Sequence, residues 1–196
     1  ATHYYERTAK INYMKNICIS FANTFSDNWE QNAWNKALQK AIGEYNTAFS
    51  YNGNINFQYA PPQSNCYSAP SHHISIYIGD YGNDYGNDPN QAWDGKGDGE
   101  SWWSKKPGDW IKLNTHEYAD LGGYYDLELR TSLFMHEIGH TIGLLHTNSG
   151  SGKAISSTRY DPMSGNSMFT QGGSRNTPEA KFTTYDIKAF KALYPN

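Results

Sequence analysis

Apolar and polar residues alternate along some stretches of the chain and recur every three or four positions along others, so both strands and helices are predicted. The alternating stretches predict strands at 10–24, 55–59, 73–78 and 109–114. The helical spacing predicts helices at about 28–49 and at 127–143, and a last helix that begins at Thr183 or Thr184 and ends at Pro195. The pattern therefore predicts a fold of the α/β class.

Helix 28–49 carries a clear start signal and a clear packing face. Asp27 stands at its N-cap position and Glu30 follows three residues later, which is the spacing of a capping box. One face of the helix holds small residues at regular intervals, namely Ala33, Ala37, Ala41 and Ala48. We expect this face to pack closely against a sheet. In the same way, Asp126 is expected to cap helix 127–143.

Residues 79–108 form a long connection that is rich in Asp, Asn and Gly. Its carboxylates are Asp80, Asp84, Asp88, Asp94, Asp98 and Glu100. Such a cluster of oxygen ligands is compatible with a bound Ca2+ ion, although the spacing matches no EF-hand loop. The alternative, which we favour, is a solvated turn region.

The composition limits the classes of function. A chain of 196 residues suits a single domain, 1–196. The formal net charge of −3 leaves no basic surface for nucleic acid. No apolar run approaches the roughly 18 residues of a membrane span. No signal-peptide pattern opens the chain, so we expect Ala1 to begin a processed or trimmed domain. We expect this domain to be a monomer.

Charged residues make up only 18% of the chain, whereas it contains 16 Tyr and 18 Gly. This surface chemistry is common in secreted bacterial enzymes, so we expect a secreted or cell-surface protein. Cys18 and Cys66 are the two cysteines. Because exported proteins retain disulfides, we predict that these two residues pair.

The candidate chemistry is concentrated in the segment HEIGHTIGLLH, from His136 to His146. On a helix, His136 and His140 share one face, where both imidazoles can bind one zinc ion at about 2.0–2.1 Å. Glu137 lies beside the first ligand and can act as a general base on a water without binding the metal. Gly143 can adopt a positive φ, which ends the helix and turns the chain so that His146 becomes a third ligand. Three ligands and one open position are typical of a catalytic zinc site.

The residues around the motif bear on the alternatives to a zinc site. A short HExxH motif occurs by chance in many helices, but the extension to His146 fixes two further positions. Apolar residues form a separate stripe on the same helix: Met135, Ile138, Ile142 and Leu145. One face of the helix is therefore expected to pack on a core and the other to face a cleft. For the pair His72–His73 we favour hydrogen bonding over a second metal site.

The extended motif resembles that of the metzincin zinc endopeptidases, whose zinc lies above a methionine-containing turn. The chain is most similar to the bacterial dual-action HEIGH metallopeptidases. This similarity rests on HEIGH, the third histidine, the stretch Asp161-Pro162-Met163-Ser164 and the pattern FTxYDIxAxxxLYP at 182–195. It covers about 107–196. In the N-terminal half, the strand–helix–strand order and a Trp/Ala-rich helix followed by Tyr-Asn agree.

The resemblance implies a metzincin-like catalytic domain with a twisted, mostly parallel sheet, two long helices and a small C-terminal lobe. The upper lobe would span about 1–143 and the lower lobe about 144–196, with the zinc in the cleft between them. The methionine turn would be formed by Met163 or Met168. An antiparallel edge strand in the region of 109–114 would pair with extended substrate. The tryptophans of this region either line the substrate cleft or cover the upper lobe: Trp93, Trp102, Trp103 and Trp110.

The expected function is zinc-dependent hydrolysis of internal peptide bonds in a polypeptide substrate. Catalysis would depend on Glu137, and zinc on His136, His140 and His146. The alternative is a zinc-bound module that binds protein or carbohydrate without turnover. A carbohydrate-binding module would explain the aromatic residues but not the zinc motif, and an inert module would usually lack the general base.

Overall fold

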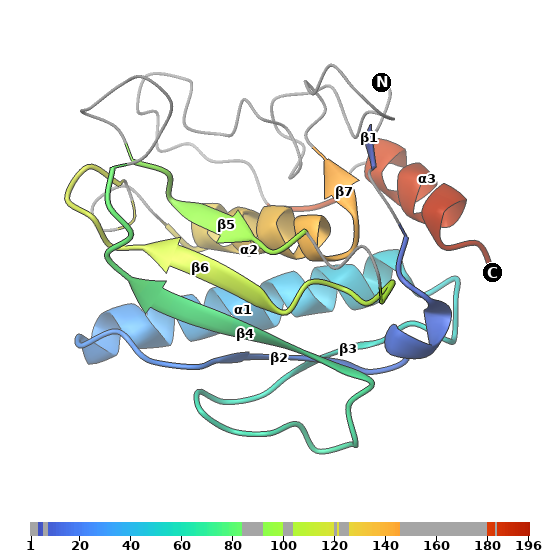
Figure 1. Ribbon diagram of the computed structural model, residues 1–196, viewed down its shortest axis with the longest axis horizontal. Helices are drawn as coiled ribbons and strands as arrows, with labels where there is room; N and C mark the ends of the chain where they lie inside the picture. The colour runs from blue at the N-terminus through green and yellow to red at the C-terminus, as the bar shows by residue number, and fades with distance from the viewer. Residues whose placement is uncertain are drawn as a thin grey trace.

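The protein is built around a five-stranded sheet with the strand order β3-β2-β4-β6-β5 (Figure 1). The computed structural model describes residues 4–5, 8–83, 92–99, 104–119, 121, 126–145, 180–182 and 184–196. The strands of this sheet are β2 (Ile17–Phe21), β3 (Phe57–Tyr59), β4 (His72–Gly79), β5 (Gly95–Gly97) and β6 (Trp110–Asn114). Neighbours pair in parallel except β5, which is antiparallel to β6. The predicted α/β class and the mostly parallel sheet are confirmed.

Two long helices, α1 (Asn28–Ala48) and α2 (Leu127–Thr141), pack together on one face of the sheet (Figure 1). Both begin at the predicted caps. The side chain of Asp27 accepts hydrogen bonds from the backbone N–H groups of Trp29 and Glu30, and Asp126 accepts one from Leu129 N at 2.8 Å. Glu30 departs from the capping-box prediction, because its carboxylate accepts from Trp34 Nε1 at 3.2 Å.

The first strand is shorter than predicted. Ile11–Tyr13 forms a short 3-10 helix, η1, and only Ile17–Phe21 of the predicted stretch 10–24 forms β2. Ile17, Ile19 and Phe21 are fully buried, whereas Ile11 is 41% exposed. The alternating pattern extends beyond β2 because it does not show where strand pairing ends: only residues 17–21 pair with β4, and only 17–19 also pair with β3.

Three short strands were not predicted. β5 lies within the connection 79–108, and β1 (Tyr4–Tyr5) pairs antiparallel with β7 (Leu144–Leu145) in a separate two-stranded sheet. β5 has the sequence Gly-Lys-Gly, and glycine is depleted in strands, so its local sequence argues against its observed structure. Tertiary pairing with β6 overrides that preference.

Aromatic rings join the helices to the sheet and to the C-terminal helix α3 (Thr184–Leu193). The ring of Phe134 on α2 lies 5.9 Å from that of Phe21 on β2 and 5.5 Å from that of Trp34 on α1. The ring of Phe190 on α3 stacks on Phe49 at 4.8 Å. Phe190 and Leu193 pack inward, since both are buried. None of the described helices combines the length and the apolar character that a membrane span requires.

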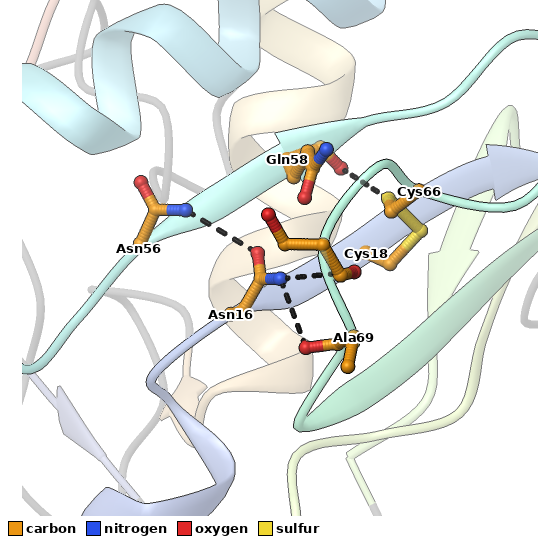
Figure 2. The surroundings of a disulfide bond; sticks show 7 residues. Asn16, Cys18, Asn56, Gln58, Cys66 and Ala69 are labelled. Atoms are coloured by element: carbon orange, nitrogen blue, oxygen red, sulfur yellow. Dashed lines mark hydrogen bonds between the residues drawn. A yellow bond between two sulfur atoms is a disulfide. The ribbon is translucent and has the colours of Figure 1, made fainter.

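The predicted Cys18–Cys66 disulfide is present (Figure 2). Cys18 alternates along β2 with buried Ile17 and Ile19, so it points to the face of the sheet opposite α1. The loop between β3 and β4 carries Cys66. Asn16 also holds this loop, by donating to the carbonyls of Ser68 and Ala69 at 3.3 and 3.2 Å. Closing a loop of about 49 residues stabilises the folded chain by about 4 kcal/mol on chain-entropy grounds.

Candidate metal centre

Helix α2 determines where His136 and His140 lie. The apolar stripe predicted on this helix is confirmed for Met135 and Ile138, which are 0% exposed, and for Ile142, which is 1% exposed. This stripe anchors one side of the helix in the core. His136 and His140 occupy another side, where both are only partly buried. The helix thus holds two imidazoles near the surface on a rigid support.

The two imidazoles converge on a single point. Their Nε2 atoms lie 3.1 Å apart, and their ring centroids lie 4.7 Å apart. Two nitrogens bound tetrahedrally to one zinc at about 2.0–2.1 Å are separated by roughly 3.3 Å. The observed separation therefore matches a shared zinc ion without a change of helix geometry. The prediction that the two imidazoles lie close enough to share one ion is confirmed.

A backbone carbonyl fixes the orientation of the second imidazole. His140 Nδ1 lies 2.8 Å from Leu144 O, and because a carbonyl can only accept, the proton resides on Nδ1. Nε2 then carries the lone pair that a metal needs. The contact depends on Gly143, whose φ of 106° turns the chain back toward the ring. The predicted role of Gly143 in ending the helix is confirmed.

Glu137 is a buried carboxylate beside the histidine pair. It is 4% exposed, and Oε1 lies 3.8 Å from His136 Nε2. Its Oε2 has no hydrogen-bond partner within the described part of the chain. His136, Glu137 and His140 offer ligand atoms that all lie within 4.8 Å of one another. An unsatisfied buried carboxylate oxygen next to two imidazoles fits a site for a divalent cation and a water molecule.

The electrostatic surroundings of Glu137 support the same fit. Burial is the largest effect and raises the pKa of Glu137 to about 8. A backbone hydrogen bond from Gly97 and the charge of Lys96 lower this pKa, while Asp94 raises it. A cation near the carboxylate would favour its charged form. The nitrogen donors of the site suit zinc in particular.

Strand β5 lies directly against α2. A Cβ atom on Gly97 would fall 2.3 Å from Glu137 O and 3.1 Å from His140 Cβ. One on Gly95 would fall 3.4 Å from Glu137 Cγ. The glycines of β5 therefore permit a close approach that larger residues would prevent. This strand was not predicted from the sequence, although two glycines flanking one lysine are a signal of close backbone approach.

Several predicted residues fall outside the described part of the chain. These are His146, expected as the third ligand, and Met163 and Met168, the alternatives for the methionine turn. Trp102 and Trp103 also lie outside it, as does most of the predicted lower lobe. Their roles stay predictions.

Trp93 and Trp110 pack against partners other than the histidine pair. Ile111 and Leu113 on β6 are fully buried on the side of α2, so Trp110 points to the opposite face of the sheet. Lys112 Nζ lies 4.4 Å from the ring of Trp110 on that face. Trp93 is 9% exposed and stacks on Tyr81 at 5.5 Å. For Trp93 and Trp110 the covering role is the one that fits.

Three of the other candidate ligands, His72, Asp80 and Asp98, are engaged in local hydrogen bonds. His72 Nε2 donates to Gly108 O at 2.8 Å, which supports the hydrogen-bonding interpretation of the His72–His73 pair. In the connection 79–108, Asp80 accepts from Gly82 N and Asp98 accepts from Asp109 N. In the described ranges, the one group of three potential ligands is the group at Glu137. Calcium binding stays a prediction, because residues 84–91 lie outside those ranges.

No family model matches the chain, and no curated protein matches it. The resemblance to metzincins therefore rests on the motif residues and their spacing.

Proposed function

We propose that this protein is a zinc-dependent endopeptidase. The observation that carries the proposal is the convergence of His136 Nε2 and His140 Nε2 at 3.1 Å beside the buried carboxylate of Glu137. His136 and His140 would hold the zinc, with His146 as the expected third ligand. When bound, zinc would supply a Lewis acid that polarises a water and the scissile carbonyl.

Glu137 is the proton carrier in this proposal. Its buried carboxylate is placed to accept a proton from the attacking water and then to deliver it to the leaving amine. Its low exposure strengthens electrostatic interactions, because charges interact more strongly away from bulk water. The backbone hydrogen bond from Gly97 helps to hold the carboxylate in place.

Strand β5 supports a polypeptide as the substrate. It forms one edge of the described sheet and lies against α2, with Gly97 close to His140. An extended peptide can add to such an edge through backbone hydrogen bonds, which favours binding of chain segments over small molecules. The Cys18–Cys66 disulfide supports an exported location, where such bonds persist.

The first test is Glu137→Gln, which keeps the side-chain shape and removes the base. Zinc content should stay at about one per chain, while hydrolysis of a casein substrate falls by roughly 10²–10⁴-fold. Glu117→Gln is the matched control, because it makes the same chemical change at an exposed position.

Full activity of Glu137→Gln would rule out the proposed mechanism. If the zinc-loaded wild type binds zinc but cleaves nothing in a broad peptide library, the alternative of a binding module without turnover replaces the endopeptidase.

A further inference from the structure

The turn after α2 is held by contacts from both end regions of the chain. It spans residues 142–145 and contains Leu144, whose carbonyl orients His140. Figure 1 shows β1, β7 and α3 close together beside the end of α2. Pairing with β1 and a hydrogen bond from Tyr194 join these distant segments to the turn.

The C-terminal contact comes from Tyr194, immediately after α3. Its side chain is buried, and its hydroxyl donates to Ile142 O at 2.7 Å. The same hydroxyl accepts from Ala9 N at 2.9 Å, so one side chain connects three segments of the chain. Ile142 is the C-cap residue of α2, where carbonyls lack partners inside the helix.

The N-terminal contact comes from β1. Its residues Tyr4 and Tyr5 pair with Leu145 and Leu144, the two residues of β7. The turn is thus held on one side by backbone pairing and on the other by the hydroxyl of Tyr194.

We propose that Tyr194 is a positioning residue for the metal ligand His140. Its hydroxyl anchors the carbonyl of Ile142, where the chain leaves α2, and so limits the paths by which Gly143 can bring the Leu144 carbonyl to the ring. That carbonyl holds the proton on Nδ1 of His140 and leaves Nε2 available to a metal. The inference rests on the proposed function, in which His140 is a metal ligand. The orientation of the His140 ring itself can be measured in the metal-free protein.

Gly143 is the reason that an external restraint matters here. With no Cβ and a φ of 106°, it restricts the backbone less than any other residue would. The conformation of the turn is therefore fixed mainly by its contacts with other segments. A hydrogen bond to Ile142 O acts one residue before Gly143, at the point where the chain leaves the helix.

The test compares Tyr194→Phe with Tyr51→Phe. Tyr51 is the matched control, because its hydroxyl donates to Phe190 O and Tyr194 O at 2.9 and 2.7 Å, at the end of α3, without touching the turn. Both variants keep the aromatic ring and remove one hydroxyl. Gly143→Ala serves as a second variant, because it strains the turn directly at a positive φ.

Two readouts are measured on folded protein. Imidazole nitrogen NMR of the metal-free chain reports the tautomer of His140, and competition with a chromogenic chelator reports zinc affinity. In Tyr194→Phe we expect a lower population of the Nδ1–H tautomer and about a threefold to tenfold weaker zinc affinity, below the effect of losing a direct partner of a ligand. Gly143→Ala should shift the same NMR signals, and Tyr51→Phe should match the wild type in both readouts.

An unchanged His140 tautomer in Tyr194→Phe overturns the inference, and so does an equal loss of zinc affinity in Tyr51→Phe. If the wild type binds no zinc, the proposed function fails, whereas the tautomer measurement still decides the role of Tyr194.

Discussion

His140 has a defined neighbour at each ring nitrogen, with Leu144 O near Nδ1 and His136 Nε2 near Nε2. The second neighbour could be predicted from the sequence, because residues four apart lie on one face of a helix. The first could not, because it depends on the direction in which the chain leaves the helix at Gly143. The sequence indicated a turn there but not which carbonyl would reach the ring.

For Glu137 too, one property could be predicted from the sequence and another could not. Its position next to His136 made a general base predictable from the motif. Its burial and its contact with Gly97 depend on a strand that lies about 40 residues earlier in the chain, and no local pattern reports that packing.

His72 gives a prediction for the pH dependence of stability. Burial lowers its pKa from the ordinary value of 6.5, while the hydrogen bond to Gly108 and the nearby Asp109 raise it, and Lys106 and His73 lower it. Because the pKa is lower in the folded state, the unfolded chain binds more protons as the pH falls below 6.5. The contribution of His72 to stability is therefore complete above pH 6.5 and is lost as the pH falls through the folded pKa.

The variant His72→Gln removes this titration and should lose less stability than the wild type between neutral pH and mildly acidic pH. Urea unfolding at a series of pH values measures the effect. His73→Gln is the comparison, because that residue is exposed on the opposite face of β4 and has the smallest of the effects on the pKa of His72, so its slope should change less. Equal slopes for wild type and His72→Gln would contradict the buried, neutral state of His72.

At the scale of elements, the sequence predicted the helices better than the strands. Helices α1 and α2 carry their own signals, namely a capping Asp and an apolar stripe, and both were placed within two residues. Strands β1, β5 and β7 are two or three residues long and exist through pairing with distant segments. A local pattern of that length cannot distinguish a strand from a loop.

The packing of β5 on α2 yields a prediction at Gly97. Gly97→Ala would place a Cβ atom 2.3 Å from the carbonyl oxygen of Glu137, which belongs to a helix backbone and cannot move aside. β5 must then shift away from α2. We expect destabilisation of about 1–3 kcal/mol and, on the proposed function, a loss of peptide hydrolysis of roughly 10²-fold.

Gly43→Ala is the matched control, because a Cβ there meets nothing within 4 Å and Gly43 lies inside helix α1. It should stabilise the protein by about 0.5–1 kcal/mol, as alanine does in an exposed helix. Chemical unfolding of both variants gives the comparison. Wild-type stability in Gly97→Ala would show that β5 does not lie against α2 in solution, whatever the activity.

At the scale of the whole molecule, the sheet bears α1 and α2 on one face and carries the disulfide on the other. The C-terminal helix reaches the same core through Phe190 and the turn at 142–145 through Tyr194. In this arrangement, residues near both ends of the chain contact the turn at 142–145 that follows α2. The sequence predicted the α/β class and the disulfide. It did not predict that residues near both ends of the chain meet at the end of α2, because those contacts form only in the packed molecule.

The proposed zinc site should contribute to the stability of the whole protein, since His136 and His140 belong to α2 and the expected ligand His146 follows β7. A metal bound at 100 times its Kd stabilises the native state by about 2.7 kcal/mol, which for a chain of this size raises Tm by roughly 5–10 °C. Calorimetry of zinc-loaded and chelator-treated protein measures this shift. His146→Ala should reduce it strongly, because two ligands hold the ion less well than three, whereas His73→Gln should keep it. A full shift in His146→Ala would mean that His146 is not a ligand, and the site would then need a different third group.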